Sequence, residues 1–303
     1  MPQLSLMTWN VRYFGHGTGG LLSTRGWLRR VADGFAEVAP DVAALQEVEQ
    51  HASLRGGLSE TPQIGRFLEQ LNGALAERGS EKRYSALYYP AHRYGIGQRP
   101  ALYTTGLAVL VSSEVEVVLD NAEAPASITH VRVPALAALK QRRIAAHARL
   151  RLRGGQETLD LFNTHLSLPA FFEGGPHTVH VRMGHGSNQL REVEALLEVF
   201  RSRASSGHAV VMGDFNSRPG SPAWQAMLDA GFVDAYADHR RLSPTESEAK
   251  STAKFMNLRM HIDHVFSTPG LRWVDLDAHG IDDKGPFFGL SDHSPKIGTV
   301  ELA

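Results

Sequence analysis

The stretch His208–Pro219, HAVVMGDFNSRP, carries the strongest fold signal in the chain. Ala209–Met212 is a short apolar run with β-branched residues, so it predicts a buried strand, and Gly213 marks its end. Asp214 and Asn216 follow with one residue between them. Residues two apart in an extended segment point to the same side, so this carboxylate and this amide are expected to face one space. Asp and Asn are also ordinary turn residues, so the stretch alone leaves a turn and a site equally open.

The composition is that of a globular protein. The chain has 303 residues, 42% hydrophobic and 21% charged, and is long enough to bury a large core. A formal net charge of −1 argues against non-specific binding of nucleic acid, but leaves a local basic cleft open. The absence of cysteine excludes disulfides, thiolate metal ligands and thiol nucleophiles.

The start of the chain, MPQLSLMTWN, does not resemble a signal peptide. No apolar run approaches the ~18 residues that a membrane span needs. We therefore expect a cytoplasmic protein without integral membrane association, and we expect a monomer.

Short strand-like runs recur along the chain, and helical patterns lie between some of them. The strand-like runs are Leu4–Trp9, Val42–Leu45, Leu107–Val111, Ile144–Leu152, Leu159–Asn163, Ala209–Met212, Ile262–Ser267 and Ile297–Leu302. Apolar spacings of three and four predict helices over Arg25–Val38, Ile64–Leu75, Ser187 or Asn188 to about Arg203, and Pro222–Leu228. Gly154-Gly155 predicts a hairpin between two adjacent runs, so part of the sheet is expected to be antiparallel. No linker or repeat interrupts this order, which predicts a single α/β domain over residues 1–303.

Three longer stretches without such patterns are predicted to be loops that border a substrate: Ala91–Thr105, Leu168–Gly186 and Arg240–Met260. The second contains His177, His180 and His185, which could hold a second metal or, with Arg182, contact a phosphate or headgroup, and we favour a loop that borders the substrate cleft over a metal site. Arg142 and Arg143 begin a strand-like run and could face phosphates or only solvent.

Polar residues stand where the strand-like runs end or begin. They are Asn10, Gln46, Glu47, His165, Asp214, Asn216, Asp263, Asp292 and His293. Each alone has an ordinary explanation, such as a turn residue, a helix cap or a hydrogen-bonded core histidine. Groups that project from several strand ends can converge on one crevice, so their occurrence together favours a site.

The motif blocks TWN, LQE, NTHL, GDFN, IDHVF and SDH occur in this order from residue 8 to residue 293. In this order they resemble the endonuclease/exonuclease/phosphatase superfamily of metal-dependent phosphoesterases, and the resemblance covers almost the whole chain. It implies an α/β fold, a four-layer α/β sandwich in which two stacked, mostly antiparallel β-sheets are flanked by helices. It also implies an active site at one end of the sandwich.

The resemblance implies a metal site. Glu47 would be the principal ligand of Mg²⁺, with Asp292 and Asn10 nearby, directly or through water. Mg²⁺ prefers oxygen ligands and usually retains waters, so one or two carboxylates are enough. Mn²⁺ is the alternative ion.

The resemblance also implies catalytic roles. His293 would be the general base that activates water, with its ring oriented by Asp263. Asp214 would orient the water or help to deprotonate it, and the division of work between Asp214 and His293 is left open. Asn216 and His165 would bind the non-bridging phosphoryl oxygens.

The expected activity is hydrolysis of a phosphodiester by in-line attack of water, and the favoured substrate is a nucleic acid or nucleotide. A phospholipid headgroup or inositol phosphate is the alternative, and a non-catalytic binding module of the same fold is the alternative from another class. Abasic-site endonucleases of this superfamily have a tyrosine-bearing motif where this chain has Asn163-Thr164-His165, which argues against that activity. The sequence from Gly15 to Gly20 matches GxGxxG, but a dinucleotide site there would leave the later motifs unexplained.

Overall fold

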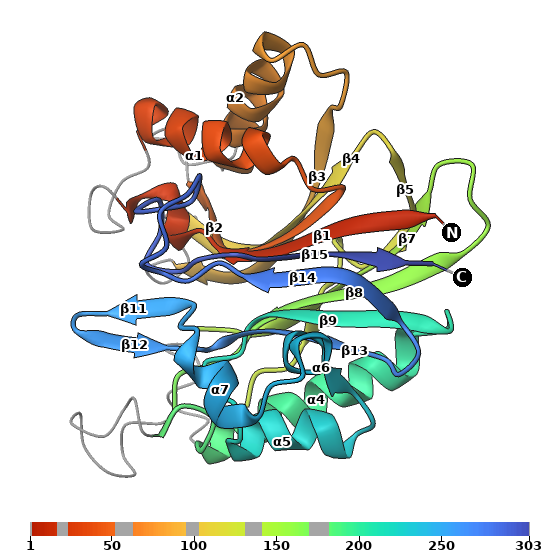
Figure 1. Cartoon of the computed structure of the whole chain (residues 1–303), viewed down its shortest axis with the longest axis vertical. Helices are drawn as coiled ribbons and strands as arrows, with labels where there is room; N and C mark the ends of the chain where they lie inside the picture. Colours follow the sequence, from red (N-terminus) through yellow and green to blue (C-terminus); the bar gives the residue numbers. More distant parts are fainter. Residues whose placement is uncertain are drawn as a thin grey trace.

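The computed structural model describes residues 2–16, 24–51, 63–94, 103–130, 141–169 and 182–302, without the side chains of residues 50, 51, 93, 94 and 103. Two β-sheets are stacked face to face, and helices cover the outer face of each (Figure 1). The chain ends lie near one another on one side of the sandwich, and the β11–β12 hairpin (Ala253–Phe255 and Leu258–Met260) projects from the opposite side. The predicted four-layer arrangement is confirmed.

The first sheet has the strand order β14-β15-β1-β2-β4-β3. Its strands are β1 (Gln3–Asn10), β2 (Val42–His51), β3 (Tyr84–Tyr94), β4 (Tyr103–Ser112), β14 (Arg272–Ala278) and β15 (Lys296–Glu301). All neighbours in this order are antiparallel except β1 and β2, which run parallel.

The second sheet has the order β10-β13-β9-β8-β7-β5, and β6 pairs with β7 beside it. Its strands are β5 (Val115–Asp120), β6 (Ala126–Ser127), β7 (Ile144–Leu152), β8 (Thr158–His165), β9 (His208–Asp214), β10 (Val233–Asp234) and β13 (Asp263–Ser267). Here only β8 and β9 are parallel, and β7 and β8 form the predicted hairpin.

Three apolar cores separate the four layers. The helices α1 (Arg25–Val38) and α2 (Gln63–Glu77) pack on the first sheet through residues such as Phe35 and Phe67. The inner faces of the two sheets bury aliphatic residues such as Val109 and Leu161 between them. The helices α4 (Ser187–Arg203) and α5 (Pro222–Asp229) cover the second sheet. Burial of these apolar faces holds the two sheets and the covering helices together.

The smaller elements are the 3₁₀ turn η1 (Arg12–Phe14) and the short helices α6 (Ala235–Arg240) and α7 (Pro244–Ala249). No helix of the described segments is long and apolar enough to cross a membrane.

Two predicted loops are partly wrong. β3 continues to Tyr94 and β4 already begins at Tyr103, so the expected loop Ala91–Thr105 is strand at both ends. The expected loop Arg240–Met260 contains α7 and the β11–β12 hairpin. Both pieces are short and mixed in polarity, so their periodicity is weak, and pairing within the fold decides their conformation. Most of the expected loop Leu168–Gly186, with His177 and His180, lies outside the described residues, as do Gly17–Gly20.

The two parallel pairs place the candidate site. Parallel strands run toward the same edge of a sheet, so the end of β1 brings Asn10 beside Gln46 of β2, and the ends of β8 and β9 bring His165 beside Asp214. Antiparallel β13 adds Asp263 directly opposite Asp214. Stacking of the sheets then brings these two sets of strand ends together.

Candidate functional site

The end of β9 is built around Gly213. Its φ is +145°, and a Cβ at this position would lie 1.9 Å from the carbonyl oxygen of Thr164 on β8. Only glycine fits so close to a neighbouring backbone. The tight approach of β8 and β9 fixes Asp214 beside His165, with 3.5 Å between Asp214 Oδ2 and His165 Nε2.

Asn10 joins the two sheets. Its buried amide nitrogen donates to Asp214 Oδ2 at 3.0 Å and to Glu47 Oε1 at 3.2 Å. Its amide oxygen accepts from the backbone N–H of Arg12 at 3.0 Å, which fixes the orientation of the amide. Two carboxylates from different sheets are therefore held by one side chain.

Glu47 lies in an irregular part of β2. Pairing with β4 is interrupted between Leu45 and Val48, and Glu47 has a φ of +56°. A bulge of this kind re-aims a side chain, and a non-glycine residue in the left-handed region is costly unless its surroundings hold it. Burial raises the pKa of Glu47, and the charge of Asp292 adds to this rise, whereas His293 and Asn10 oppose it.

His293 and Asp263 form a hydrogen-bonded pair. His293 Nδ1 lies 2.9 and 3.1 Å from the two carboxylate oxygens of Asp263. Thr252 Oγ1 donates to Asp263 Oδ2 at 2.7 Å, and Trp9 Nε1 donates to the backbone carbonyl of His293 at 2.9 Å. Burial alone would lower the pKa of His293, but the carboxylates of Asp263 and Asp214 raise it to about 10.

Asp214 faces both histidines. Its Oδ2 lies 3.8 Å from His293 Nε2 as well as 3.5 Å from His165 Nε2. Burial raises the pKa of Asp214 to about 7, with the charge of Asp263 adding to the rise and that of His293 opposing it. The pKa of His165 is lowered well below its usual value by burial and by the charges of Arg143 and His293. The neutral imidazole of His165, the charged imidazole of His293 and the carboxyl of Asp214, whose pKa lies near 7, thus share one space.

Asn216 closes the turn after β9. Its φ of +46° lies in the left-handed region, which asparagine tolerates better than most residues. Its backbone N–H donates to Asp214 Oδ1 at 2.9 Å, and its amide nitrogen donates to the carbonyl of Leu166, also at 2.9 Å. An amide nitrogen carries two protons, so one remains for a ligand.

Asp292 lies at the rim of the site and pairs with Arg12, with 3.1 Å between Asp292 Oδ2 and Arg12 Nη1. Neither Arg12 nor Thr252 was singled out from the sequence. Arg12 directly follows the TWN block, so its position was a usable signal. Thr252 reaches Asp263 only because β13 and the segment before β11 meet in the fold, and no local pattern indicates this.

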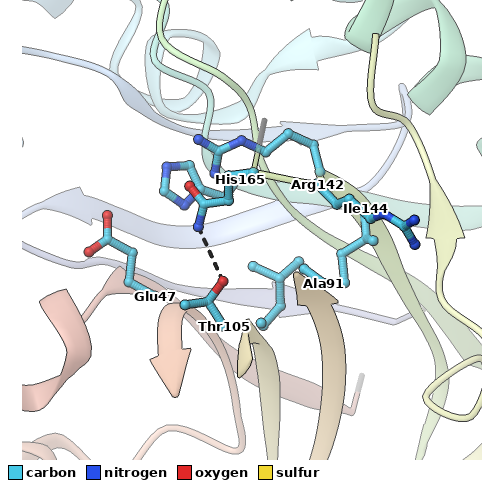
Figure 2. Close-up of a pocket in the computed structure, with 10 residues that line it drawn as sticks. Glu47, Ala91, Thr105, Arg142, Ile144 and His165 are labelled. Carbon is cyan, nitrogen blue, oxygen red and sulfur yellow. Dashed lines mark hydrogen bonds between the residues drawn. The ribbon is translucent and has the colours of Figure 1, made fainter. Parts of the chain in front are cut away.

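A cavity of about 780 Å³ opens over these residues. The site side chains Glu47, His165, Asp214, Asn216, Asp292 and His293 line it together with Arg143, Leu168 and the β11–β12 hairpin. At the hairpin tip Phe255 is 61% and Met256 79% exposed. Beside it a smaller recess is lined by Glu47 and His165 and by Arg142, Arg143 and Ala91 (Figure 2). All eight predicted site residues therefore belong to one connected region: seven lie at the cavity or in its hydrogen-bonded wall, and Asn10 lies beneath it.

Two groups of described side chains could hold a cation. Ligand atoms of Asp214, Asp263 and His293 all lie within 4.8 Å of one another, but His293 and Asp263 are already paired. Glu47 and Asp292 offer oxygens only, the donor type that Mg²⁺ prefers. Asn10 presents its amide nitrogen to Glu47, so it would reach a cation there through water. The like charge of Asp292 that raises the pKa of Glu47 is the repulsion that a divalent cation would relieve. The second group fits Mg²⁺ better.

Comparison with known proteins finds one family and a shared fold. A family model described as the Endonuclease/Exonuclease/phosphatase family matches residues 7–293. No curated protein matches the chain in sequence.

Solved structures share the fold at low identity. A family protein from Leptotrichia buccalis is 17% identical with a TM-score of 0.66, over 99% of this chain and 100% of the other. ANGEL2, a 2′,3′-cyclic phosphatase, is 16% identical with a TM-score of 0.61, over 98% and 95%. The mannosyl-6-phosphatase Bt3783 of Bacteroides thetaiotaomicron is 16% identical with a TM-score of 0.61, over 99% of each chain. At these identities the likeness supports the fold alone.

Proposed function

The chain belongs to the endonuclease/exonuclease/phosphatase family, and we propose that it is a divalent-metal-dependent phosphoesterase that hydrolyses a phosphodiester by in-line attack of water. The observation that carries the proposal is the His293–Asp263 pair, whose free imidazole nitrogen faces Asp214 inside a cavity that Glu47 also lines. Membership of the family supports the reaction class, and the positions of the side chains support the role proposed for each residue.

His293 and Asp214 handle the proton of the attacking water. With Nδ1 donating to Asp263, Nε2 of His293 is the nitrogen that faces the cavity, and Asp214 Oδ2 lies 3.8 Å away. A water placed between these two atoms can lose its proton to either of them. The pKa of Asp214 is raised to about 7, close to neutrality, where a group accepts and releases protons most effectively.

Glu47 and Asp292 would hold Mg²⁺ or Mn²⁺, and Asn10 would contribute through water. When bound, the cation would act as a Lewis acid toward the phosphoryl group and its charge would lower the pKa of His293 toward neutrality. Asn10 also keeps Glu47 and Asp214 at fixed separation through its two hydrogen bonds.

Asn216 and His165 bind the phosphoryl oxygens. Asn216 has one amide proton that is not committed to Leu166. His165 is kept neutral by burial and by Arg143, so it can donate a hydrogen bond without adding a further full charge. Donors that are fixed before the reaction stabilise the negative charge on the non-bridging oxygens in the transition state.

A nucleic acid or nucleotide is the proposed substrate class, since Arg143 and Lys254 add positive charge to the cavity while Phe255 offers an exposed aromatic face. The exposed Phe255–Met256 tip favours a phospholipid headgroup as the second candidate, because large apolar side chains at a cavity rim also suit a lipid. Liposomes that contain a phosphodiester lipid, assayed beside a short oligonucleotide, distinguish the two. The predicted monomer and cytoplasmic location stay predictions.

The reaction is tested with bis-p-nitrophenyl phosphate in Mg²⁺ or Mn²⁺. The wild type is expected to hydrolyse it, and removal of the metal with EDTA is expected to abolish the activity. Equal rates for the wild type and His293→Gln on this reporter and on a panel of other phosphoesters would reject the enzyme and favour a non-catalytic binding module.

The metal assignment is tested with Glu47→Gln, which keeps the size of the side chain but removes its charge. The metal concentration for half-maximal activity is expected to rise by about 10–100-fold or more. Loss of a residue that only supports a metal ligand already weakens metal affinity by that factor. Glu157→Gln, at an exposed position between β7 and β8, is the control. Identical Mg²⁺ titration curves for Glu47→Gln and the wild type would overturn the assignment.

A further inference from the structure

The small recess beside the catalytic cavity is lined by residues of two kinds. Glu47 and His165 of the catalytic cavity line it together with Arg142 and Arg143 (Figure 2 labels Glu47, His165 and Arg142). Glu47, His165, Arg143 and Gln141 line both the recess and the larger cavity, so the two spaces are continuous. The recess holds about 20 Å³, room for about one water molecule, so a group of a substrate seated in the cavity would lie at its opening.

Neither arginine has a carboxylate partner within the described segments. Arg143 Nε donates to Ser167 Oγ at 3.4 Å, and no ion pair involves Arg142 or Arg143 among the residues that the structure places. Arg12 and Arg218 differ, since they pair with Asp292 and Glu248. The recess thus holds two guanidinium groups whose charge is not neutralised by a described acidic side chain.

The position of Arg143 is fixed from both sides. Its backbone N–H donates to Thr129 Oγ1 at 2.7 Å, and its carbonyl accepts from the same hydroxyl at 3.1 Å. Ser167, which accepts from the guanidinium, is held in turn by Glu192 through its N–H and its hydroxyl, both at 2.7 Å. A group that is positioned before binding loses little conformational freedom when a ligand arrives.

Both charges act on the site. The charge of Arg143 opposes the burial-driven rise in the pKa of Glu47 and adds to the fall in the pKa of His165. Beyond burial, Arg142 and Arg143 both contribute to the lowered pKa of His92, on β3 next to Ala91 of the recess. The positive charge therefore extends from the phosphoryl site along the recess.

The geometry points to a second anion-binding subsite in which Arg142 and Arg143 hold a further phosphate of the substrate, beside the phosphoester that is cleaved. This inference rests on the proposed phosphoesterase activity and narrows its substrate class to molecules with at least two phosphate groups. Guanidinium groups bind phosphate through paired N–H donors, which makes arginine the suited residue. Because Arg142 lines the recess and not the larger cavity, it reports on the second phosphate and not on the cleaved one.

The test uses the dinucleotide TpT without a terminal phosphate, with a 5′-terminal phosphate and with a 3′-terminal phosphate. The wild type is expected to show a KM about tenfold lower or more for one of the two phosphorylated forms, the size expected for hydrogen bonds to a charged group. The relevant ratio is the KM for TpT without a terminal phosphate divided by the KM for the preferred phosphorylated form. In Arg142→Ala this ratio is expected to fall toward one, and in Arg142→Lys part of it is expected to remain. Arg201→Ala, exposed on α4, is the control and should keep the full ratio.

A binding measurement separates failure of the subsite from failure of the activity. Titration calorimetry compares thymidine 3′,5′-bisphosphate with thymidine 5′-monophosphate, and inositol 1,4-bisphosphate shows whether the second phosphate needs a nucleotide. Tighter binding of either bisphosphate by the wild type, lost in Arg142→Ala, supports the subsite even if no dinucleotide is cleaved. Cleavage of TpT with no preference for any terminal phosphate, or a preference that Arg142→Ala leaves intact, overturns it while the proposed function stands.

Discussion

The pairs His293–Asp263 and His147–Asp160 each use a carboxylate of the second sheet, and of the two only the first belongs to the site. His293 pairs with Asp263 at the end where the cavity opens, and His147 of β7 pairs with Asp160 of β8, with 2.7 Å between His147 Nε2 and Asp160 Oδ1. Both carboxylates are fully buried, and both imidazole–carboxylate contacts are short. A distance criterion alone would treat the two pairs as equivalent.

The surroundings of the two carboxylates differ. Asp160 also accepts from Arg149, from the backbone N–H groups of Ser205 and Ser206, and from the Ser206 hydroxyl. Asp263 has one further side-chain donor, Thr252. Asp160 is thus a saturated acceptor that ties the start of β8 to the segment before β9.

The two imidazoles also differ, in whether a ligand can reach them. His147 stacks on Phe162 with ring centroids 4.4 Å apart and is 1% exposed, so no ligand reaches it. The side chain of His293 is 12% exposed, lines the cavity and directs Nε2 toward Asp214. A histidine–aspartate pair is therefore suited to catalysis when its second nitrogen faces a ligand space, and to stability when that nitrogen is enclosed.

The largest contrast is expected in the rate. His293→Gln should lower kcat by about 10²–10⁴-fold, the usual contribution of a general acid or base, because glutamine cannot exchange the proton of the water. His147→Gln is the matched control, and its kcat at a temperature where it is folded should equal that of the wild type. Steady-state kinetics on bis-p-nitrophenyl phosphate measures both. A similar loss of kcat in the two variants would remove the distinction.

The free energy of unfolding is expected to depend more on Asp160 than on Asp263. Asp160→Asn breaks a buried charged network and should lower the free energy of unfolding by about 3–5 kcal/mol, because the groups around it lose their partner. Asp263→Asn should lower the rate more than the stability, because the cavity gives its surroundings access to water. Urea unfolding followed by circular dichroism measures the difference. Equal losses of stability in both variants would contradict it.

The pH dependence of stability should follow Asp160. Burial alone would raise its pKa, but hydrogen bonds from His147, Ser206 and Arg149 outweigh burial and hold the pKa well below its usual range. A carboxyl whose pKa is lowered in the folded state stabilises the fold above its unfolded pKa, about 3.9, and loses this contribution as the pH falls below it. The wild type should lose stability below about pH 4 more steeply than Asp160→Asn. Parallel curves for the two proteins in acid would show that Asp160 is not responsible.

The smallest effect is expected for the outer hydrogen bond of each pair. Thr252→Val keeps the shape of the side chain but removes the donor to Asp263, and kcat should fall by about tenfold, since the carboxylate then holds the imidazole less firmly. Ser206→Ala should instead lower the free energy of unfolding by about 1 kcal/mol and leave kcat unchanged. A change in kcat for Ser206→Ala alone would reverse the assignment of the two pairs.

The sequence predicts which polar residues meet in space better than it predicts the strands. Seven of the eight predicted site residues stand at strand ends or close to them, and parallel pairing in each sheet collects such ends. Glu47 instead lies at the irregularity within β2, which continues to His51 and not only to the predicted Leu45. Gly213 marks the end of a strand in the sequence, and the reason for it lies in the fold: because it has no Cβ, β8 and β9 can approach each other. The edge strands β3, β5 and β14 were not predicted. The exposed and mixed patterns of β5 and β14 lack the apolar run that marks a buried strand.

The residues that support the site could not be found in the same way. Thr252, Arg12 and the β11–β12 hairpin act through partners far along the chain, for which the local sequence has no periodicity to reveal. The two histidine–aspartate pairs make the same point, because His147 and Asp160 look no less catalytic in the sequence than His165 does.

By itself the sequence determined which chemical groups this protein carries and the order in which strands deliver them, since turn residues, glycines and apolar runs act locally. Tertiary structure alone decided which of these groups share a space, which carboxylates are saturated, and where two arginines are left without an acidic partner in the described chain. The physical reason is that burial and charge depend on neighbours that only the stacked sheets bring together. Those neighbours separate the His293 site from the His147 pair and place Arg142 and Arg143 beside it.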